Sequence, residues 1–167
     1  ASCLKHFPGL GAATEDPHQG LSTISLTMEQ FENGEKAAFA AGIEAGADMV
    51  MISTASAPEL TGNNDPCIFS SSLVTDVLRN EMGFDGVIIT DALNMSAVSE
   101  YYGSAEAAVM ALRAGCDMIL MPEDFEAAYE GVLQAVQDGQ ISEERINDAL
   151  KRIYRIKYRE KYAEQIE

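Results

Sequence analysis

Polar side chains that could move protons follow two segments of the sequence that are typical of buried strands. Asp16 and His18 stand two positions apart, with Pro17 between them. At this spacing a carboxylate can accept a hydrogen bond from one imidazole nitrogen and leave the other free, as a general acid/base histidine requires. Asp91 directly follows the apolar run at 87–89 and Thr90. This carboxylate could take part in chemistry, or it could cap the next helix or bind a backbone amide.

The first candidate strand leads to Lys5 and His6, which extend the set of residues that could do chemistry. His6, Glu15, Asp16 and His18 could in principle hold a metal, but they show no H-E-x-x-H pattern or other dedicated ligand spacing. The glycines at 9 and 11 lack the G-x-x-x-x-G-K pattern of a phosphate-binding loop. The sequence therefore predicts no metal and no cofactor, with a purely polar loop as the alternative for residues 15–18.

A repeated phrase shows how the chain is organised. AGADMVMI at 45–52 returns as AGCDMILM at 114–121, and each copy follows a helical pattern. Gly46 and Gly115 are therefore predicted to end helices before strands. A third strand is expected over 86–90 and a short one over 2–4. Such continuous apolar runs suit a parallel sheet buried on both faces.

Helical patterns alternate with these strands. Thr27 and Ser142 are expected to begin the first and the last helix, and further helices are predicted over 71–82, 125–136 and 146–158. The alternation predicts an α/β fold with a parallel sheet and right-handed crossovers. Long loops at 7–26 and 54–69 follow the carboxyl ends of strands, where α/β folds place their chemistry.

Composition narrows the class of protein further. Of the 167 residues, 47% are hydrophobic and 23% are charged, as in an ordinary globular protein. This length suits one domain but excludes a complete eight-stranded (βα) barrel, which needs roughly 200 residues at the least. The 11 basic and 27 acidic residues give a net charge of −16, which disfavours nucleic acid and anionic membrane as partners. No apolar run is long enough to span a membrane, and Lys5 and His6 interrupt any signal-peptide pattern.

Two smaller features allow more than one interpretation. Six of the 11 basic residues lie between Lys151 and Lys161. A helix bearing them could bind an anion, although a solvated helix face is the favoured interpretation. The three cysteines, Cys3, Cys67 and Cys116, stand far apart and are expected to be small buried hydrophobic side chains.

Several longer motifs occur together along the chain. They are KHFPGLG at 5–11, EDPH at 15–18, PCIFS at 66–70, GFDGVIITDALNM at 83–95 and DGQISEERI at 138–146. This combination closely resembles the family-three glycoside hydrolases, and more narrowly their β-N-acetylhexosaminidase branch. The resemblance spans nearly the whole chain, and it implies a retaining exo-acting hydrolase of β-linked N-acetylglucosamine, with a carbohydrate as the partner.

The resemblance also implies roles for individual residues. Asp91 matches the catalytic nucleophile, which forms a covalent glycosyl intermediate, and His18 matches the acid/base in place of the second carboxylate of most retaining glycosidases. Asp16 matches the partner that orients the imidazole. Lys5 and His6 match residues that bind sugar hydroxyls. Leu10 departs from the family pattern, where many relatives carry histidine, and this could alter the polarity of the loop base.

A larger departure is that only the last four strands of the family's (βα)8 barrel have counterparts. Residues 1–167 are therefore expected to be a single segment, the C-terminal half of the catalytic domain, and to be inactive alone. The alternative is a non-catalytic half-barrel that self-associates, or pairs with a missing half, through unpaired strand edges. A third possibility, a phosphate-binding isomerase barrel, fits less well because Pro122-Glu123-Asp124 would repel phosphate.

Overall fold

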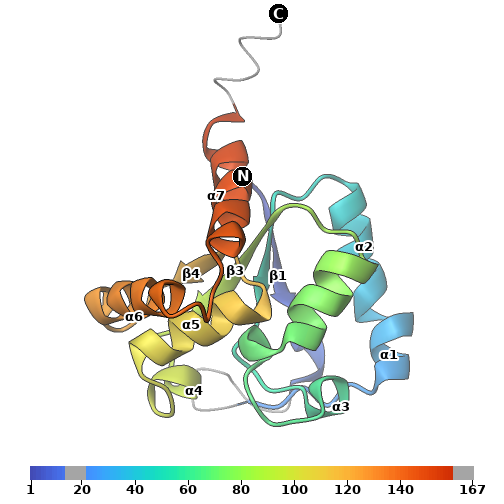
Figure 1. Ribbon diagram of the computed structural model, residues 1–167. Coiled ribbons are helices and arrows are strands. Elements are labelled where there is room, and N and C mark those ends of the chain that lie inside the picture. Colours follow the sequence, from blue (N-terminus) through green and yellow to red (C-terminus); the bar gives the residue numbers. More distant parts are fainter. Residues whose placement is uncertain (14–21, 160–167) are drawn as a thin grey trace, which may run out of the picture.

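The computed structural model describes residues 1–13 and 22–159, and its centre is a four-stranded parallel sheet (Figure 1). The strands β1 (Cys3–Phe7), β2 (Met49–Ile52), β3 (Val87–Ala92) and β4 (Met118–Leu120) lie side by side in chain order. Every neighbouring pair is parallel. The predicted α/β fold with parallel βα repeats is thus confirmed.

Helices connect the strands. They are η1 (Leu10–Ala12), α1 (Met28–Asn33), α2 (Glu35–Glu44), α3 (Pro58–Thr61), η3 (Cys67–Phe69), η4 (Ser72–Glu81), α4 (Ser96–Ser99), α5 (Ser104–Ala114), α6 (Phe125–Gln137) and α7 (Glu143–Lys157). The predicted caps are confirmed, because Thr27 forms a capping box with Gln30 and the Ser142 hydroxyl accepts the Arg145 N–H. The first helical pattern is broken at Gly34 into α1 and α2.

Two strands extend beyond their predicted ends. β1 continues to Phe7 and β3 to Ala92, so Lys5, His6 and Asp91 lie within strands and not directly after them. The sequence predicted that these strands end at Leu4 and Thr90, at or just after the last residue of each apolar run. Parallel pairing continues further, with Phe7 opposite Ile52 and Ala92 opposite Leu120, because backbone hydrogen bonds do not depend on apolar side chains.

The hydrophobic core lies on one face of the sheet, beneath the helices. Val50 and Ile52 point to this face and are fully buried. Phe7 packs edge-to-face against Phe31, with ring centroids 5.8 Å apart, and against Phe39 at 5.0 Å. By the alternation of a strand, Met49 and Met51 point to the opposite face, where they are only half-buried. The described part of the chain therefore covers the two faces unequally.

The aspartate of each repeated phrase clamps the beginning of the strand before it in the sheet. Asp48 accepts a hydrogen bond from the Ser2 N–H at 2.7 Å, next to β1. Asp117 accepts one from the Ile88 N–H at 3.0 Å, in β3. Both carboxylates lie at the amino ends of the strands, so the repeat has a structural role in holding neighbouring strands together.

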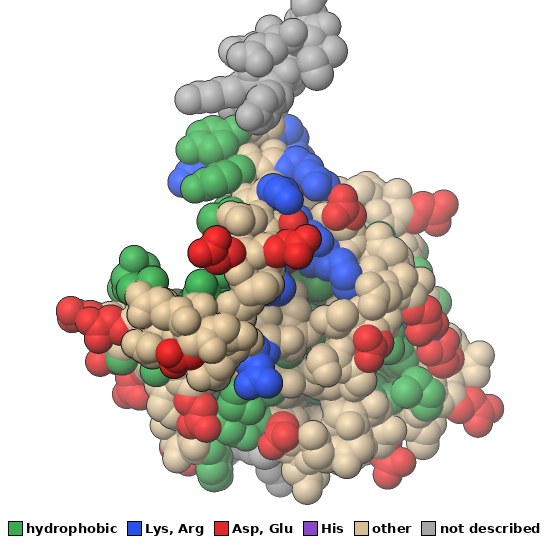
Figure 2. Space-filling model, viewed as in Figure 1, with side chains coloured by type: hydrophobic (Ala, Val, Ile, Leu, Met, Phe, Trp, Pro, Cys, Tyr) green, Lys and Arg blue, Asp and Glu red, His purple; other side chains and the backbone are tan. Residues whose placement is uncertain are grey.

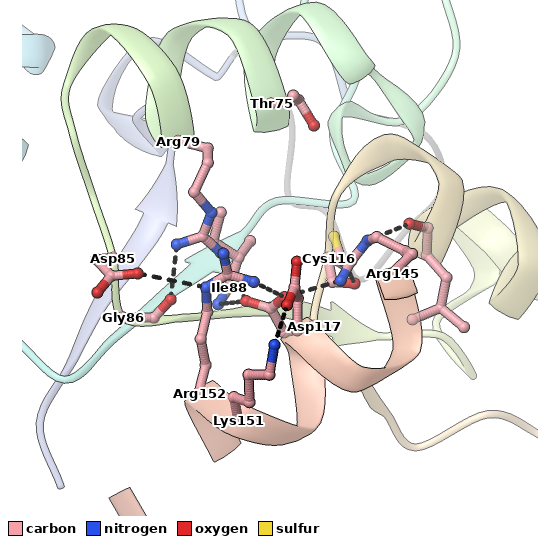
Figure 3. Close-up of polar contacts among 12 residues, drawn as sticks. Thr75, Arg79, Asp85, Gly86, Ile88, Cys116, Asp117, Arg145, Lys151 and Arg152 are labelled. Carbon is pink, nitrogen blue, oxygen red and sulfur yellow. Dashed lines mark hydrogen bonds and ion pairs between the residues drawn. The ribbon is translucent and has the colours of Figure 1, made fainter. Parts of the chain in front are cut away.

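Asp117 is also the centre of a cluster that attaches α7 to the sheet (Figure 3). Its side chain is 0% exposed and accepts hydrogen bonds from Arg79 at 2.6 Å, Arg145 at 3.1 Å and Arg152 at 3.2 Å. Arg79 comes from η4, whereas Arg145 and Arg152 come from α7. One buried carboxylate thus joins two helices to the amino edge of the sheet.

The basic residues at the end of the chain form a largely exposed helix face, as expected, and some of them also form ion pairs. Figure 2 shows Lys and Arg side chains gathered along the side of α7 that borders the rest of the molecule. Arg155 pairs with Asp85 at 2.6 Å, and Arg159 pairs with Asp48. The favoured interpretation of a solvated face holds for most of these side chains, and the structure adds that arginines in and just after α7 form ion pairs with acids at the amino edge of the sheet.

Two glycines of the repeated phrase allow a matched test of packing. Gly46 and Gly115 both have positive φ, at 87° and 121°. An added Cβ would meet no atom at Gly46 but would collide with the Thr75 hydroxyl at Gly115. Gly46→Ala is expected to lower the free energy of unfolding by about 1–2 kcal/mol through backbone strain. Gly115→Ala is expected to lower it by about 1–3 kcal/mol more, because Thr75 must move. Equal losses in urea denaturation would contradict this packing.

Two further expectations can be compared with the structure. Cys67 and Cys116 are buried, and burial raises the pKa of each thiol to about 12, whereas Cys3 is only half-buried. All three thiols are free. Over residues 1–13 and 22–159, no helix has the length and apolar character needed to cross a membrane.

Candidate active site

His6 and Asp91 meet at the carboxyl edge of the sheet. The His6 Nε2 atom lies 3.7 Å from the Asp91 Oδ2 atom, although β2 separates their strands. Alternate strands of a sheet are roughly 10 Å apart, so the two side chains reach toward each other past the end of β2. There Ile52 is followed by the small, buried Ser53. The sheet order thus brings together two residues that are 85 positions apart in the sequence.

Both side chains are partly accessible. The His6 side chain is 25% exposed and that of Asp91 is 17% exposed. The Asp91 Oδ1 atom accepts a hydrogen bond from the N–H of Ala92 at 2.8 Å, which fixes one carboxylate oxygen. The other oxygen faces the imidazole. A carboxylate held in this way is oriented by its own strand and remains open to a ligand on one side.

Burial and a neighbouring cation favour the neutral form of His6. Desolvation lowers the pKa of the imidazole below its ordinary value of 6.5, Asp91 raises this pKa, and the positive charge of Lys5 lowers it. A neutral imidazole has one donor and one acceptor nitrogen, so it can hydrogen-bond hydroxyl groups in either sense. Lys5 is exposed on the same strand and offers three N–H donors.

The titration of His6 tests this arrangement. Asp91→Asn is expected to lower the pKa of His6 further, because the attraction that favours the imidazolium is lost, and Lys5→Met is expected to raise it. Proton NMR of the imidazole measures both shifts. Because folding lowers this pKa, protonation of His6 favours the unfolded chain. His6 should therefore lower the free energy of unfolding as the pH falls below 6.5. Identical pKa values in all three proteins would show that the groups do not interact.

The remaining predicted residues fall outside the described parts of the chain. Asp16 and His18 lie between residues 13 and 22, so the structure does not test their geometry. Of the five predicted site residues, Lys5, His6 and Asp91 are described. His6 and Asp91 meet directly, and Lys5 acts on His6 through its charge.

Sequence reasoning missed two residues at the same edge. Thr54, just after β2, is buried and donates its hydroxyl hydrogen to the Met95 sulfur at 3.9 Å. Met121, just after β4, accepts a hydrogen bond from the Asn94 N–H at 3.0 Å. A search of every position that follows a strand would have found Thr54 and Met121, whereas attention to titratable groups alone passed over them.

The described residues offer acid/base and nucleophilic groups and no metal cage. Within residues 1–13 and 22–159, no group of three or more His, Cys, Asp or Glu side chains could hold a metal ion. A partly exposed carboxylate beside a neutral imidazole can bind a polyhydroxy ligand and attack an electrophilic carbon. The fold and this edge define an α/β protein with a candidate hydrolytic site at the carboxyl ends of parallel strands.

The chain belongs to glycosyl hydrolase family 3. The model of the "Glycosyl hydrolase family 3 N terminal domain" matches residues 1–156. A "Beta-hexosaminidase" of Xylella fastidiosa is 39% identical over 118 residues, which are 71% of this chain and 35% of that protein. A "Beta-N-acetylglucosaminidase/beta-glucosidase" of Cellulomonas fimi is 27% identical over 166 residues, which are 94% of this chain and 29% of that protein.

The structural comparison agrees with the family assignment. A glycoside hydrolase family 3 beta-N-acetylglucosaminidase from Paenibacillus sp. str. FPU-7 superposes with a TM-score of 0.91 and 40% identity, over 95% of this chain and 31% of that one. A beta-N-acetylhexosaminidase from Beutenbergia cavernae superposes with a TM-score of 0.83 and 34% identity, over 93% of this chain and 46% of that one. The chain thus spans about a third of the length of these curated relatives and less than half of these structures.

Proposed function

We propose that this chain carries catalytic residues of a retaining glycoside hydrolase that removes terminal β-linked N-acetylglucosamine. The observation that carries the proposal is the placement of Asp91. Its carboxylate lies near the carboxyl end of β3, is fixed by the Ala92 N–H and lies 3.7 Å from His6. The names of the hexosaminidase relatives supply the substrate class.

The proposed reaction proceeds in two displacements. In the first, Asp91 attacks the anomeric carbon and forms a glycosyl ester, while the bond to the leaving oxygen breaks and His18 gives that oxygen a proton. In the second, His18 takes a proton from water, the water oxygen attacks the same carbon, and the ester bond to Asp91 breaks. Two inversions give net retention. Asp16 is the proposed partner that orients the imidazole of His18.

Lys5 and His6 are the proposed binding residues for the sugar hydroxyls. Lys5 is exposed on β1 and presents a cation with three donors. His6 lies beside Asp91, and burial lowers its pKa and so favours the neutral imidazole, which can donate a hydrogen bond to a sugar hydroxyl without forming an ion pair with the Asp91 carboxylate. Substitution of Lys5 or His6 should raise KM more than substitution of an exposed residue far from the candidate site does.

We propose in addition that the four strands form half of an eight-stranded barrel and that residues 1–167 alone are inactive. Among the described residues, the outer edges of β1 and β4 have no strand partner. Met49 and Met51 are half-buried on the face away from the helices, and Phe125 is exposed on α6. This open surface favours the second candidate function, a half-barrel that self-associates or pairs with further βα units.

The test measures both the reaction and its stereochemistry. The full-length gene product that carries these residues is incubated with an aryl β-N-acetylglucosaminide, and proton NMR follows the first-formed sugar. Release of the β-anomer supports the proposal, whereas release of the α-anomer or an absence of hydrolysis contradicts it. Light scattering and the same assay on residues 1–167 alone test the half-barrel: an active monomer would contradict both inactivity and pairing.

A further inference from the structure

Met121 has an unusual backbone conformation at the carboxyl edge of the sheet. Its φ is 45°, and it is the one non-glycine residue with positive φ in the described parts of the chain. A residue with a Cβ pays a conformational cost in this region, and the residue before a proline, here Pro122, normally adopts extended backbone. Such strain persists where the surroundings enforce it, and it is concentrated at functional sites.

The surroundings of Met121 are the segment that carries Asp91. The Asn94 N–H donates to the Met121 carbonyl at 3.0 Å, and the Leu93 N–H donates to the Leu120 carbonyl at 2.9 Å. Leu120 is also the partner of Ala92 in the sheet. Ordinary strand spacings then put the Cα atom of Met121, one residue after the end of β4, roughly 7–8 Å from that of Asp91 in β3.

The side chain of Met121 is left accessible by this arrangement. It is 57% exposed, although a large apolar side chain gains free energy from burial. The other described side chains of the candidate site, Lys5, His6 and Asp91, are charged or polar. They can recognise hydroxyl groups but have no apolar surface to offer. A thioether is polarisable and adapts its shape to small apolar groups.

We propose that Met121 selects the sugar by contacting the methyl group of its 2-acetamido substituent. The inference rests on the proposed function and adds to it a residue that discriminates an acetamido group from a hydroxyl at C2. The strained backbone holds Met121 just after β4, the strand next to the one that carries the proposed nucleophile, and so beside the place proposed for the reacting sugar ring. Removing the thioether therefore takes away a contact that a glucoside, which has no methyl group at C2, never makes.

The experiment compares two substrates in the full-length gene product. In Met121→Ala, kcat/KM for an aryl β-N-acetylglucosaminide is expected to fall by about 10-fold, the effect of losing one small apolar contact in a pocket. For the matching aryl β-glucoside it is expected to change less than about twofold. The fall should appear mainly in KM, because the contact is present in the ground state. In the same variant, the inhibition constant of N-acetylglucosamine should rise, whereas that of glucose should stay nearly unchanged.

Three further variants separate the side chain from the backbone. Met121→Gly accepts positive φ and should lose selectivity like Met121→Ala, whereas Met121→Leu should keep most of it. Met28→Ala removes an exposed methionine on α1, and kcat/KM for both substrates should stay at the wild-type value. Equal losses on both substrates, no loss on either, or normal selectivity in Met121→Gly would overturn the inference. A wild-type protein that hydrolyses neither glycoside would instead overturn the proposed function, and the inference with it.

Discussion

Asp91→Ala is expected to lower kcat on an aryl β-N-acetylglucosaminide by a factor on the order of 10⁴ or more, because no covalent intermediate can form without the nucleophile. The fold should survive, since the Asp91 side chain is partly exposed and accepts a hydrogen bond from the N–H of the adjacent Ala92. Steady-state kinetics of the full-length gene product measure the loss. Circular dichroism checks that the variant remains folded.

Two controls make the Asp91 result specific. Asp148→Ala removes an exposed carboxylate on α7 that pairs with the exposed Lys151, so the activity of this variant should equal that of the wild type. Azide is small enough to occupy the space left in Asp91→Ala, and it should restore turnover by forming an α-glycosyl azide. Turnover of Asp91→Ala within tenfold of the wild type would contradict the role of this residue.

Asp117→Ala is expected to lower the free energy of unfolding by about 3–5 kcal/mol, the usual cost of removing one partner from a buried ionic cluster. The variant leaves Arg79, Arg145 and Arg152 facing one another without their shared carboxylate. It also leaves the Ile88 N–H without its acceptor. Urea denaturation monitored by circular dichroism measures the change on residues 1–167.

The neighbouring Asp85 provides a matched control. It pairs with Arg152 and Arg155, as Asp117 pairs with its own arginines, but its side chain is exposed. Asp85→Ala should therefore cost less than about 1 kcal/mol. Asp117→Asn keeps the shape of the side chain and one acceptor oxygen, so its loss in free energy of unfolding should lie between those of Asp85→Ala and Asp117→Ala. A loss below 1 kcal/mol in Asp117→Ala would show that the cluster does not hold α7 to the sheet.

Much of the fold could be predicted from local sequence. The repeated phrase predicted β2 and β4, and the capping residues Thr27 and Ser142 predicted the beginnings of two helices. The ends of β1 and β3 were wrong because pairing with a neighbouring strand continues past the last apolar residue. The ion pairs of the basic C-terminal residues could not be predicted, because their partners Asp48 and Asp85 are distant in sequence.

The candidate site was predicted by type of residue and not by geometry. Asp91, Lys5 and His6 could be named because titratable groups near strand ends are recognisable in a sequence. The contact between His6 and Asp91 depends on the order of the strands, which local patterns do not specify. Met121 has no titratable group, so it was passed over although it directly follows a strand, and its positive φ and its hydrogen bond to Asn94 leave no local sequence signal.

The most direct test of the account is to trap the covalent intermediate. An aryl N-acetylglucosaminide that carries a fluorine on its ring and a good leaving group should form the glycosyl enzyme faster than water releases it. Mass spectrometry of the full-length gene product, followed by peptide mapping, is expected to locate one N-acetylglucosamine-derived ester on Asp91. A labelled protein whose sugar lies on another residue, or an active enzyme that accumulates no adduct, would contradict the claim that Asp91 is the nucleophile.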